Sequence, residues 1–362
     1  MMHKIIMHID LDYFFAQCEE LRNPTIKTKP VVVCVFSNRG NNSGVVATSN
    51  YIARRYQVKS GIPIIIAKKK LTGTNAVFLK SDYHHYSRIS VKIMNIIKKY
   101  ADMFEYVGKD EAYLDISKTS NENYKQAELL AYKIKNKIFN ETKLTCSIGV
   151  SHNKLLAKIA SSYKKPSGLT IVKPENTNYF LSQLEISKIP KIGSKTIKKM
   201  KEMNIHTIYE LKKLDIFKMN KTFGKKIGTY IHNSARGICN EKVKIKDINQ
   251  ISKIITLSRN SNEYEYILQK LFYVCKKLHE IIIKKNKLFK NVTIQLVQSN
   301  LTNKIVSKKL LRSTNDMWEL KNIIKKLLKN VWNEINNKIR RVGIIVSDLS
   351  TRTNQEKIVN FF

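Results

Sequence analysis

The sequence predicts an α+β protein of several domains, and three observations support this. The chain has 362 residues, which is too long for one ordinary domain and suits two to four domains, each with its own core. Strand-like and helix-like segments alternate from residue 1 to about 170. A βαββαβ order follows between residues 252 and 349, after a helical stretch that glycines interrupt. We therefore expect a mixed α/β domain, a small helical domain and a C-terminal α/β sandwich.

The first half of the chain alternates between the two kinds of segment. The predicted strands are residues 3–15, 30–36, the start of 44–56, both ends of 104–117, and 144–151. The predicted helices are the end of 44–56, then 82–102, 123–142 and 153–165, the last of them stopped by Pro166 and Gly168. Residues 21–80 are expected to form an insertion in this domain.

The second half is divided by a short basic run. Residues 174–238 are predicted to be helical, and 241–247 are predicted to be a linker without core residues. The βαββαβ segment comprises strand 252–259, helix 262–285, strands 291–298 and 304–311, helix 315–336 and strand 341–349. The last thirteen residues form a polar tail that ends in two phenylalanines.

The charge of the chain indicates a polyanionic partner. Lys and Arg total 66 against 28 Asp and Glu, a formal net charge of +38 that is spread along the whole length. Such an excess is typical of proteins that bind nucleic acid. Genome composition is the alternative explanation, because the chain is also rich in Asn and Ile, but it does not account for the motifs below.

The same sequence argues against several classes of protein. Its five cysteines lie far apart without a Cys-x-x-Cys pair, so we expect neither a zinc site nor a disulfide framework. No signal peptide and no run of about 18 apolar residues is present, so we expect no membrane partner. These features predict a soluble cytoplasmic protein.

Four acidic residues suggest a metal site. Asp10 and Asp12 stand two apart in a predicted strand and would share one face, where they repel unless a cation neutralises them. Asp110 and Glu111 add two carboxylates on a second strand-like segment. Such a cluster suits Mg²⁺, and two Mg²⁺ ions can stabilise the entering and leaving oxygens of phosphoryl transfer. A capping or surface role is the alternative for each residue alone.

Aromatic and basic residues near this cluster suggest a nucleotide. Phe14 and Phe15 could pack against the sugar of a triphosphate and exclude ribose by bulk, although core packing is favoured for Phe14. Tyr51 and Arg54 lie three apart on one helix face, and Lys165 precedes Pro166. Their side chains are suitable donors to phosphate oxygens, although each alone could be an ordinary surface residue.

Two further motifs point to partners. Residues 189–205 resemble a helix-hairpin-helix whose turn at Pro190 and Gly193 would present backbone N–H groups to a DNA phosphate, and 223–231 could be a degenerate second copy. A helical turn without a ligand is the alternative. In the tail, apolar groups at Ile358, Phe361 and Phe362 fall three, six and seven residues after Gln355, on one side of a helical turn. Exposed phenylalanines call for a pocket, either on a partner or on the protein itself.

Taken together, the motifs resemble those of the Y-family lesion-bypass DNA polymerases, most closely the archaeal, DNA polymerase IV-like branch. The resemblance rests on HIDLDYFFAQCEE, KPVVV, GVVATSNYIARRYQVKSGIP, DEAYLDIS, SIGVSHNKLLAKIASSYKKPSG and IPKIGSKT, in this order and across nearly the whole chain. It implies a right-hand polymerase with a ferredoxin-like palm (1–20 and 81–173), fingers (21–80), a thumb (174–240), a basic linker (241–250), a little finger (251–349) and a clamp-binding tail (350–362).

The resemblance also implies the roles of individual residues. Asp10, Asp110, Glu111 and the carbonyl of Leu11 match ligands of two Mg²⁺ ions, which Mn²⁺ can replace, whereas Asp12 matches a position that is not a usual ligand. Phe15 matches a steric gate, and the triphosphate contacts match Tyr51, Arg54 and Lys165. Val35, Val45, Ala47 and Gly61 match a small roof over the nascent base pair. DNA phosphate contacts are expected at Gly193, Lys195, Lys253, Arg259, Arg340 and Arg341.

The implied partners are primer-template DNA, deoxynucleotides and a sliding clamp of the PCNA type, which the tail (Gln355, Ile358, Phe361 and Phe362) would bind. We expect a monomer in the cytoplasm, associated with the nucleoid if the source is archaeal.

One departure from the family pattern affects the metal site. The family usually has Ser and an aliphatic residue before Asp-Glu, and here Gly108 and Lys109 stand there. On a strand Lys109 would point toward apolar packing, where an ammonium group is costly unless it is paired. Our hypothesis is that Lys109 reaches solvent or pairs with an acid and that activity is modest, so that Lys109→Ile should hold or raise turnover.

Two rival functions follow from the same residues. A catalytically weak DNA-binding partner of the clamp would explain the Gly108–Lys109 departure, but the intact Asp10, Asp110 and Glu111 argue against it. A nucleotidyl cyclase would also pair carboxylates on a palm, but it would not need the thumb, the βαββαβ domain or the tail.

Overall fold

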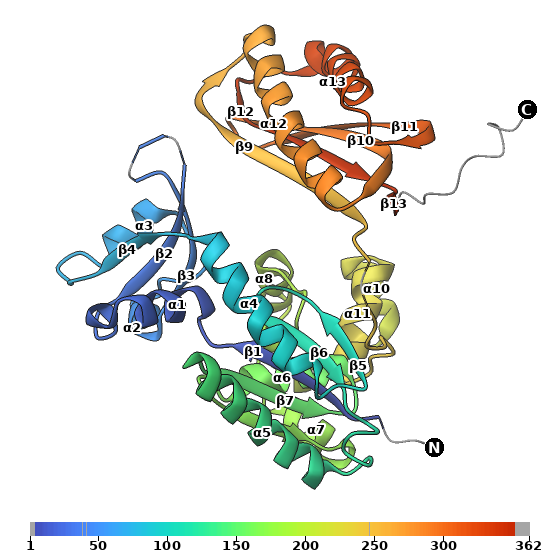
Figure 1. The fold of residues 1–362 in the computed structure, drawn as a ribbon. Coiled ribbons are helices and arrows are strands. Elements are labelled where there is room, and N and C mark those ends of the chain that lie inside the picture. Colours follow the sequence, from blue (N-terminus) through green and yellow to red (C-terminus); the bar gives the residue numbers. More distant parts are fainter. Residues whose placement is uncertain (1–3, 38, 41, 246, 352–362) are drawn as a thin grey trace, which may run out of the picture. The chain divides into compact units, whose positions relative to one another are not determined.

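The computed structural model describes residues 4–37, 39–40, 42–245 and 247–351 (Figure 1). The chain divides into two compact units, one of Met1–Val35 with Val45–Lys246 and one of Phe36–Gly44 with Asp247–Phe362. In the described ranges no helix is long and apolar enough to cross a membrane.

A five-stranded sheet in the order β5-β6-β1-β7-β8 forms the centre of the first unit. Its strands are β1 (Ile6–Leu11), β5 (Met103–Tyr106), β6 (Glu111–Asp115), β7 (Cys146–Ser151) and β8 (Leu169–Val172). The helices that pack on it are α4 (Tyr83–Lys98), α5 (Tyr124–Thr142) and α6 (Lys154–Tyr163).

The two faces of this sheet have different neighbours because side chains alternate along β1. Met7, Ile9 and Leu11 join the core formed with α4 and α5. The residues between them face α6, which packs so closely that a Cβ atom at Gly149 would lie 2.0 Å from the Ala157 carbonyl oxygen. His8 and Asp10 therefore lie on the α6 face.

The first strand is shorter than predicted. β1 ends at Leu11, Tyr13 adopts a left-handed conformation (φ 35°), and α1 (Phe14–Arg22) begins at once. The prediction of a strand through residue 15 was wrong because the chain turns at Tyr13, so the two phenylalanine rings stand on a helix.

The predicted insertion contains a small sheet in the order β3-β2-β4. Its strands are β2 (Val31–Phe36), β3 (Gly44–Ser49) and β4 (Val77–Lys80), and its helices are η1 (Pro24–Ile26), α2 (Tyr51–Arg55) and α3 (Ile64–Lys70). The tip of the β2–β3 hairpin, Phe36–Gly44, groups with the second unit.

A third part of the first unit is helical, as predicted. It comprises η2 (Pro174–Asn176), α7 (Thr177–Ser182), η3 (Ile186–Lys188), α8 (Ser194–Glu202), α9 (Ile208–Lys212), α10 (Ile216–Phe223) and α11 (Lys225–Ala235). Its core includes Met200, Leu211 and Ile231, and it extends to Leu156 and Ile159 on α6.

The second unit has the predicted βαββαβ order. Its elements are β9 (Gln250–Ser261), α12 (Tyr264–Lys284), β10 (Lys287–Gln298), β11 (Asn303–Thr314), α13 (Met317–Val331), η4 (Trp332–Glu334) and β12 (Ile339–Ser347), and β13 (Ser350–Thr351) pairs with β10. The strand order is β11-β10-β12-β9. Both helices cover one face of the sheet, where Val292, Ile294, Val342 and Ile344 form the core.

The predicted linker is not free of core residues. Val243 is only 8% exposed and packs with Ile6, Tyr113 and Ala157 of the first unit. The backbone N–H of Lys244 donates to the buried Glu105 carboxylate at 3.2 Å. The start of the basic run is therefore part of the first unit, because one apolar side chain and one hydrogen bond hold it there.

Candidate active site

The end of β1 and the loop before β6 bring three acidic residues together. Asp10 and Glu111 are direct partners across the antiparallel β1–β6 pair. Asp110 comes just before β6, and its carbonyl oxygen accepts a hydrogen bond of 2.8 Å from the N–H of Leu11. The carboxylates that the sequence assigned to one metal site thus lie on neighbouring backbone segments.

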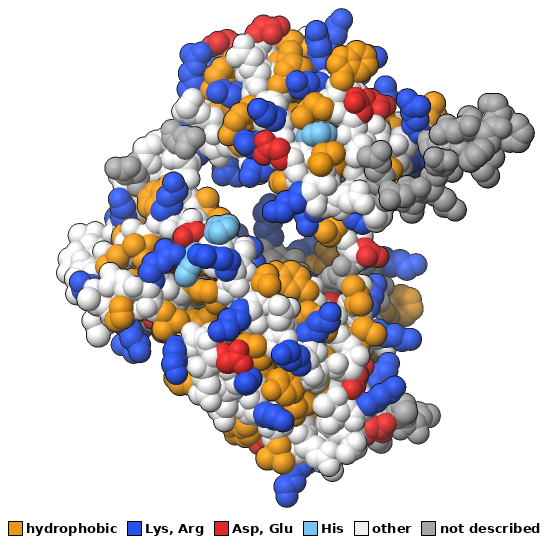
Figure 2. Space-filling view, in the orientation of Figure 1, with side chains coloured by type: hydrophobic (Ala, Val, Ile, Leu, Met, Phe, Trp, Pro, Cys, Tyr) orange, Lys and Arg blue, Asp and Glu red, His pale blue; other side chains and the backbone are white. Residues whose placement is uncertain are grey.

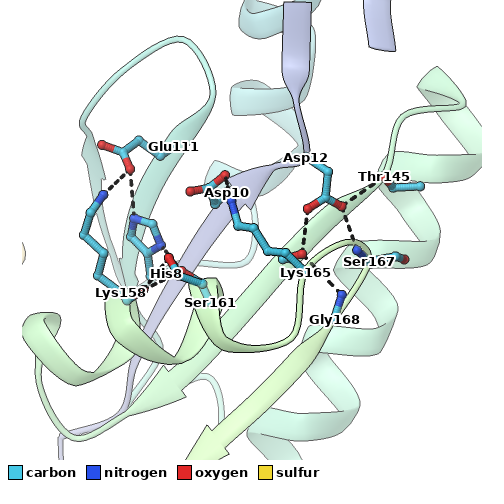
Figure 3. Close-up of polar contacts among 12 residues, drawn as sticks. His8, Asp10, Asp12, Glu111, Thr145, Lys158, Ser161, Lys165, Ser167 and Gly168 are labelled. Atoms are coloured by element: carbon cyan, nitrogen blue, oxygen red, sulfur yellow. Dashed lines mark hydrogen bonds and ion pairs between the residues drawn. The ribbon is translucent and has the colours of Figure 1, made fainter. Parts of the chain in front are cut away.

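Two lysines neutralise this group from the face of the sheet that α6 covers (Figure 3). The Lys165 ammonium pairs with Asp10, and the Lys158 ammonium, from α6, pairs with Glu111. Among the described residues, no group of three or more Asp, Glu, His or Cys side chains is arranged so that it could hold a metal ion. The donor set is nevertheless of the kind that Mg²⁺ prefers, and the ammonium groups lie where the carboxylates attract positive charge.

The carboxylates differ in their protonation behaviour. Desolvation first, and then the charges of Asp10 and Glu111, raise the pKa of Asp110 although the residue as a whole is exposed. The nearby His8 ring and then the Lys158 ammonium lower the pKa of Glu111 to about 2. A bound cation would relieve the repulsion of Asp110 by Asp10 and Glu111, so the cluster fits a divalent metal ion.

His8 lies beneath Glu111 and was not anticipated. Its ring is fully buried, Nδ1 is 2.8 Å from the Ser161 hydroxyl, and Nε2 is 3.4 Å from Glu111 Oε2. Through this contact the His8 ring lowers the pKa of Glu111. Because burial lowers the pKa of His8, the ring is neutral at pH 7 and the contact is not an ion pair.

Asp12 has a structural role. It is fully buried and accepts hydrogen bonds from the Thr145 hydroxyl (3.0 Å), the Ser147 hydroxyl (2.7 Å) and the Ser167 N–H (2.8 Å) (Figure 3). The last bond ties the loop after Lys165 to the end of β1. Asp12 therefore fixes the loop that carries a predicted phosphate contact, and it is not part of the metal cluster.

The two phenylalanines at the start of α1 have different environments. Phe14 is 2% exposed and belongs to the core, which is the role favoured for it from the sequence, and its contact with a nucleotide stays a prediction. Phe15 is partly exposed, stacks on Tyr86 (4.4 Å between ring centroids, 14°) and meets Tyr83 edge-on. The ring of Phe15 is thus held rigidly by two tyrosines of α4.

Tyr51 and Arg54 lie together at the start of α2. The Arg54 guanidinium stacks over the Tyr51 ring at 4.9 Å and is held by a 3.0 Å hydrogen bond from Nε to the Ser49 carbonyl. The Tyr51 hydroxyl is buried and has no partner among the described residues. Burial and the charge of Asp12 raise the pKa of Tyr51 to about 12, so the hydroxyl stays protonated and remains available as a donor.

Comparison with known proteins identifies the family. The impB/mucB/samB family matches residues 9–162, its C-terminal domain matches 248–358, and a DNA polymerase-iota thumb domain matches 187–238. The DNA polymerase IV of Nitrosopumilus maritimus is 50% identical over 361 residues, 99% of each chain. The chain belongs to the Y family of DNA polymerases. It is a DNA-directed DNA polymerase of the archaeal, DNA polymerase IV-like branch.

Other relatives agree with this assignment. The DNA polymerase IV of Methanosarcina acetivorans is 36% identical over 368 residues, 100% of each chain. Among solved structures, a Y-family DNA polymerase chimera of Dbh and Dpo4 aligns with a TM-score of 0.88 at 32% identity, covering 96% of this chain and 100% of that one. The insertion ternary complex of Dbh DNA polymerase aligns with a TM-score of 0.70 at 32% identity, covering 96% and 100%.

Of the residues expected to roof the base pair, Val35, Val45 and Ala47 lie on the small sheet of the fingers, and Gly61 lies in a turn. A hydrogen bond of 2.8 Å from the Ser37 N–H to the Ser43 carbonyl closes the loop between β2, which carries Val35, and β3, which carries Val45. Both valines are exposed, at 37% and 38%. Ala47 follows on β3, and Gly61 has a positive φ of 90° that a side chain would strain.

The residues expected to contact DNA phosphates lie in both units, and those of the little finger do not share one face of its sheet. In the thumb, Gly193 begins α8 without a side-chain cap, and Lys195 is exposed in the first turn. In the little finger, Lys253 pairs with Ile344 on the helix-covered face, whereas Arg341 pairs with Thr256 on the opposite face. Arg259 forms an ion pair with Glu263, and the Nε atoms of Arg340 and Arg341 are buried without a partner in the described residues.

Basic side chains are scattered over the face in view in Figure 2. The tail residues Gln355, Ile358, Phe361 and Phe362 lie outside the described residues.

Sequence reasoning missed His8 and Lys158. His8 could have been found, because it stands two residues before Asp10 on the same strand and so shares its face.

Proposed function

We propose that this polymerase performs template-directed, Mg²⁺-dependent translesion synthesis, with low fidelity and low processivity. It would transfer a nucleotidyl group from a deoxynucleotide to the primer 3′-hydroxyl. The observation that carries the proposal is the convergence of Asp10, Asp110 and Glu111 at the end of β1, with Lys165 beside them. The exposed valines of the fingers support a roof that tolerates damaged bases.

The side chains have distinct tasks in this reaction. Asp10, Asp110, Glu111 and the Leu11 carbonyl would hold two Mg²⁺ ions, which supply activation of the primer hydroxyl and stabilisation of the pentavalent phosphate. Lys165 would leave Asp10 for a triphosphate oxygen once metal is bound. Tyr51 and Arg54 would donate to other phosphate oxygens, since the Tyr51 hydroxyl is buried without a partner among the described residues.

The partners follow from the same reasoning. Duplex DNA would bind by its phosphates to basic surfaces of the thumb and the little finger. The tail is proposed to bind a sliding clamp of the PCNA type, which would compensate for low processivity. We propose that the protein acts as a monomer in the cytoplasm, at the nucleoid.

Single-nucleotide primer extension tests the proposal. With Mg²⁺ we expect insertion opposite undamaged and abasic template positions, a preference for deoxynucleotides, and loss of at least about 10³-fold of the rate in Asp110→Ala. Glu280→Ala, an exposed carboxylate on α12, is the matched control and should behave as wild type. Extension that persists in Asp110→Ala would overturn the metal assignment.

The rival function is a catalytically weak DNA-binding partner of the clamp, and the Gly108–Lys109 departure is the observation that favours it. It predicts tight binding of DNA and clamp without extension by the wild-type protein. The same assay therefore separates the two functions.

A further inference from the structure

Helix α4 carries a serine that departs from the usual behaviour of serine in helices. A helical serine commonly donates its hydroxyl to the carbonyl four residues earlier. Ser87 does so, with a bond of 2.6 Å to the Tyr83 carbonyl. Ser90, one turn later and only 2% exposed, instead donates across to the carbonyl of Lys109 at 2.6 Å.

This bond acts on the backbone immediately before Asp110. The Lys109 carbonyl belongs to the peptide unit that leads into Asp110, and Ser90 holds it. The Asp110 carbonyl belongs to the next peptide unit, and the N–H of Leu11 holds it at 2.8 Å. Because both peptide planes that flank the Asp110 Cα atom are anchored, the direction of its Cα–Cβ bond is set.

The turn before Asp110 offers few other constraints. The N–H groups of Val107 and Gly108 both donate to the Glu111 carbonyl at 3.2 Å, which closes the turn on itself. Gly108 contributes no side chain, so no hydroxyl from that position can hold the turn. Ser90 thus ties the backbone of this turn to α4.

From the sequence, the Lys109 side chain was expected to reach solvent or to pair with an acidic residue, and it does neither. It is half-buried, and its ammonium group donates to the Ser87 hydroxyl, a neutral partner on α4. The acceptor is free to receive it, because the Ser87 hydrogen is already donated to Tyr83. A side chain without this amine would still leave the Lys109 carbonyl on Ser90.

We propose that Ser90 is a positioning residue for Asp110, acting through the Lys109 carbonyl. The inference rests on the proposed function, in which Asp110 binds metal. Tyr83, Tyr86, Ser87 and Ser90 fall on one stripe of α4, at spacings of three, four and seven residues. The same helix face therefore supports the Phe15 ring and the loop of Asp110.

The experiment compares Ser90→Ala with variants that separate the bond from the fold. Ser90→Thr keeps the hydroxyl and should restore function, and Ser90→Cys keeps the volume while weakening the donor. Ser120→Ala is the matched control, because Ser120 is also a buried serine that donates to a carbonyl, that of Ile116 at 2.7 Å, beyond the other end of β6. Lys109→Ile removes the amine and keeps the carbonyl.

Two readouts are needed, one of which does not depend on turnover. The first is the Mg²⁺ concentration that gives half of the maximal rate of single-nucleotide insertion, and it is compared with the KM for the deoxynucleotide in each variant. The second is Mn²⁺ affinity, measured by electron paramagnetic resonance with primer-template DNA and a non-hydrolysable deoxynucleotide. We expect Ser90→Ala and Ser90→Cys to weaken metal affinity by about tenfold in both assays.

The controls should separate positioning from stability. Ser90→Ala and Ser120→Ala should lower Tm by a similar amount, about 2–4 °C, but only the former should change metal affinity. Ser90→Thr and Lys109→Ile should keep wild-type metal affinity. If the wild-type protein extends primers but Ser90→Ala and Ser90→Cys keep its metal affinity, this inference alone is overturned. Failure of the wild-type protein to extend primers would instead overturn the proposed function.

Discussion

Asp10 and Asp12 stand two residues apart, yet their environments are opposite. The Asp10 side chain is 19% exposed and faces an ammonium group, whereas Asp12 is fully buried and accepts three hydrogen bonds from neutral donors. The strand ends at Leu11, so the alternation that would have put both on one face does not reach Asp12. Asp10 can therefore exchange its ammonium partner for a metal ion, whereas Asp12 is held by its three hydrogen bonds.

Replacing Asp12 should affect stability before chemistry. Asp12→Ala would leave the Thr145 and Ser147 hydroxyls and the Ser167 N–H without their acceptor, so we expect a loss of about 2–3 kcal/mol in the free energy of unfolding. Urea denaturation measures this. Asp348→Ala, at an exposed carboxylate of the other unit, is the control. A change as small as that of the control would contradict the role given to Asp12.

Phe15 is expected to select the sugar. Its ring is clamped by Tyr83 and Tyr86, so it cannot swing aside to admit a 2′-hydroxyl. We expect Phe15→Ala to raise the ratio of ribonucleotide to deoxynucleotide insertion by about tenfold or more. Steady-state kinetics of single insertions give the ratio, and Phe139→Ala, an exposed phenylalanine on α5, should leave it unchanged. An unaltered ratio in Phe15→Ala would exclude Phe15 as the gate.

At the scale of elements, strand alternation decides which basic residues can act together. The β9–β12 register puts Lys253 beside Ile344 on the helix-covered face and Arg341 beside Thr256 on the open face. A duplex that lies on the open face would reach Arg341. Composition alone could not make this distinction, because both residues are basic and both lie on strands.

The two little-finger residues should therefore differ in DNA binding. Arg341→Ala should weaken binding of primer-template DNA and reduce the slope of log K against log salt by about 0.9, the value for one lost phosphate contact. Lys253→Ala should keep the wild-type slope. Fluorescence anisotropy over a range of salt concentrations measures both. Equal slope changes in the two variants would show that the duplex does not use one face of this sheet.

Periodicity and motif spacing predicted most elements and the acidic cluster, and they failed where a single residue changes the local geometry. The βαββαβ order was readable because its strands and helices are long and strongly patterned. The turn at Tyr13 was not, since a left-handed tyrosine gives no compositional signal. Neither the burial of Val243 nor the pairing of Lys158 with Glu111 could be predicted, because both depend on segments brought together by the fold.

At the scale of the whole molecule, synthesis and attachment are expected to belong to different parts of the chain. The proposed metal and nucleotide residues all lie in the first unit, and the basic run between the units is anchored to that unit by Val243 and Lys244. The expected clamp motif lies outside the described residues, beyond the βαββαβ unit. Removing the tail should therefore not disturb the chemistry.

Deleting residues 355–362 tests this separation. Single-nucleotide insertion without a clamp should keep its wild-type rate, because no described part of the active site includes the tail. With a PCNA-type clamp loaded on primed circular DNA, the wild-type protein should make longer products, and the deletion should remove that gain. Phe361→Ala with Phe362→Ala should reproduce the deletion, because the two rings supply most of the apolar area that could be buried. Clamp-dependent lengthening that survives both changes would place the contact elsewhere on the protein.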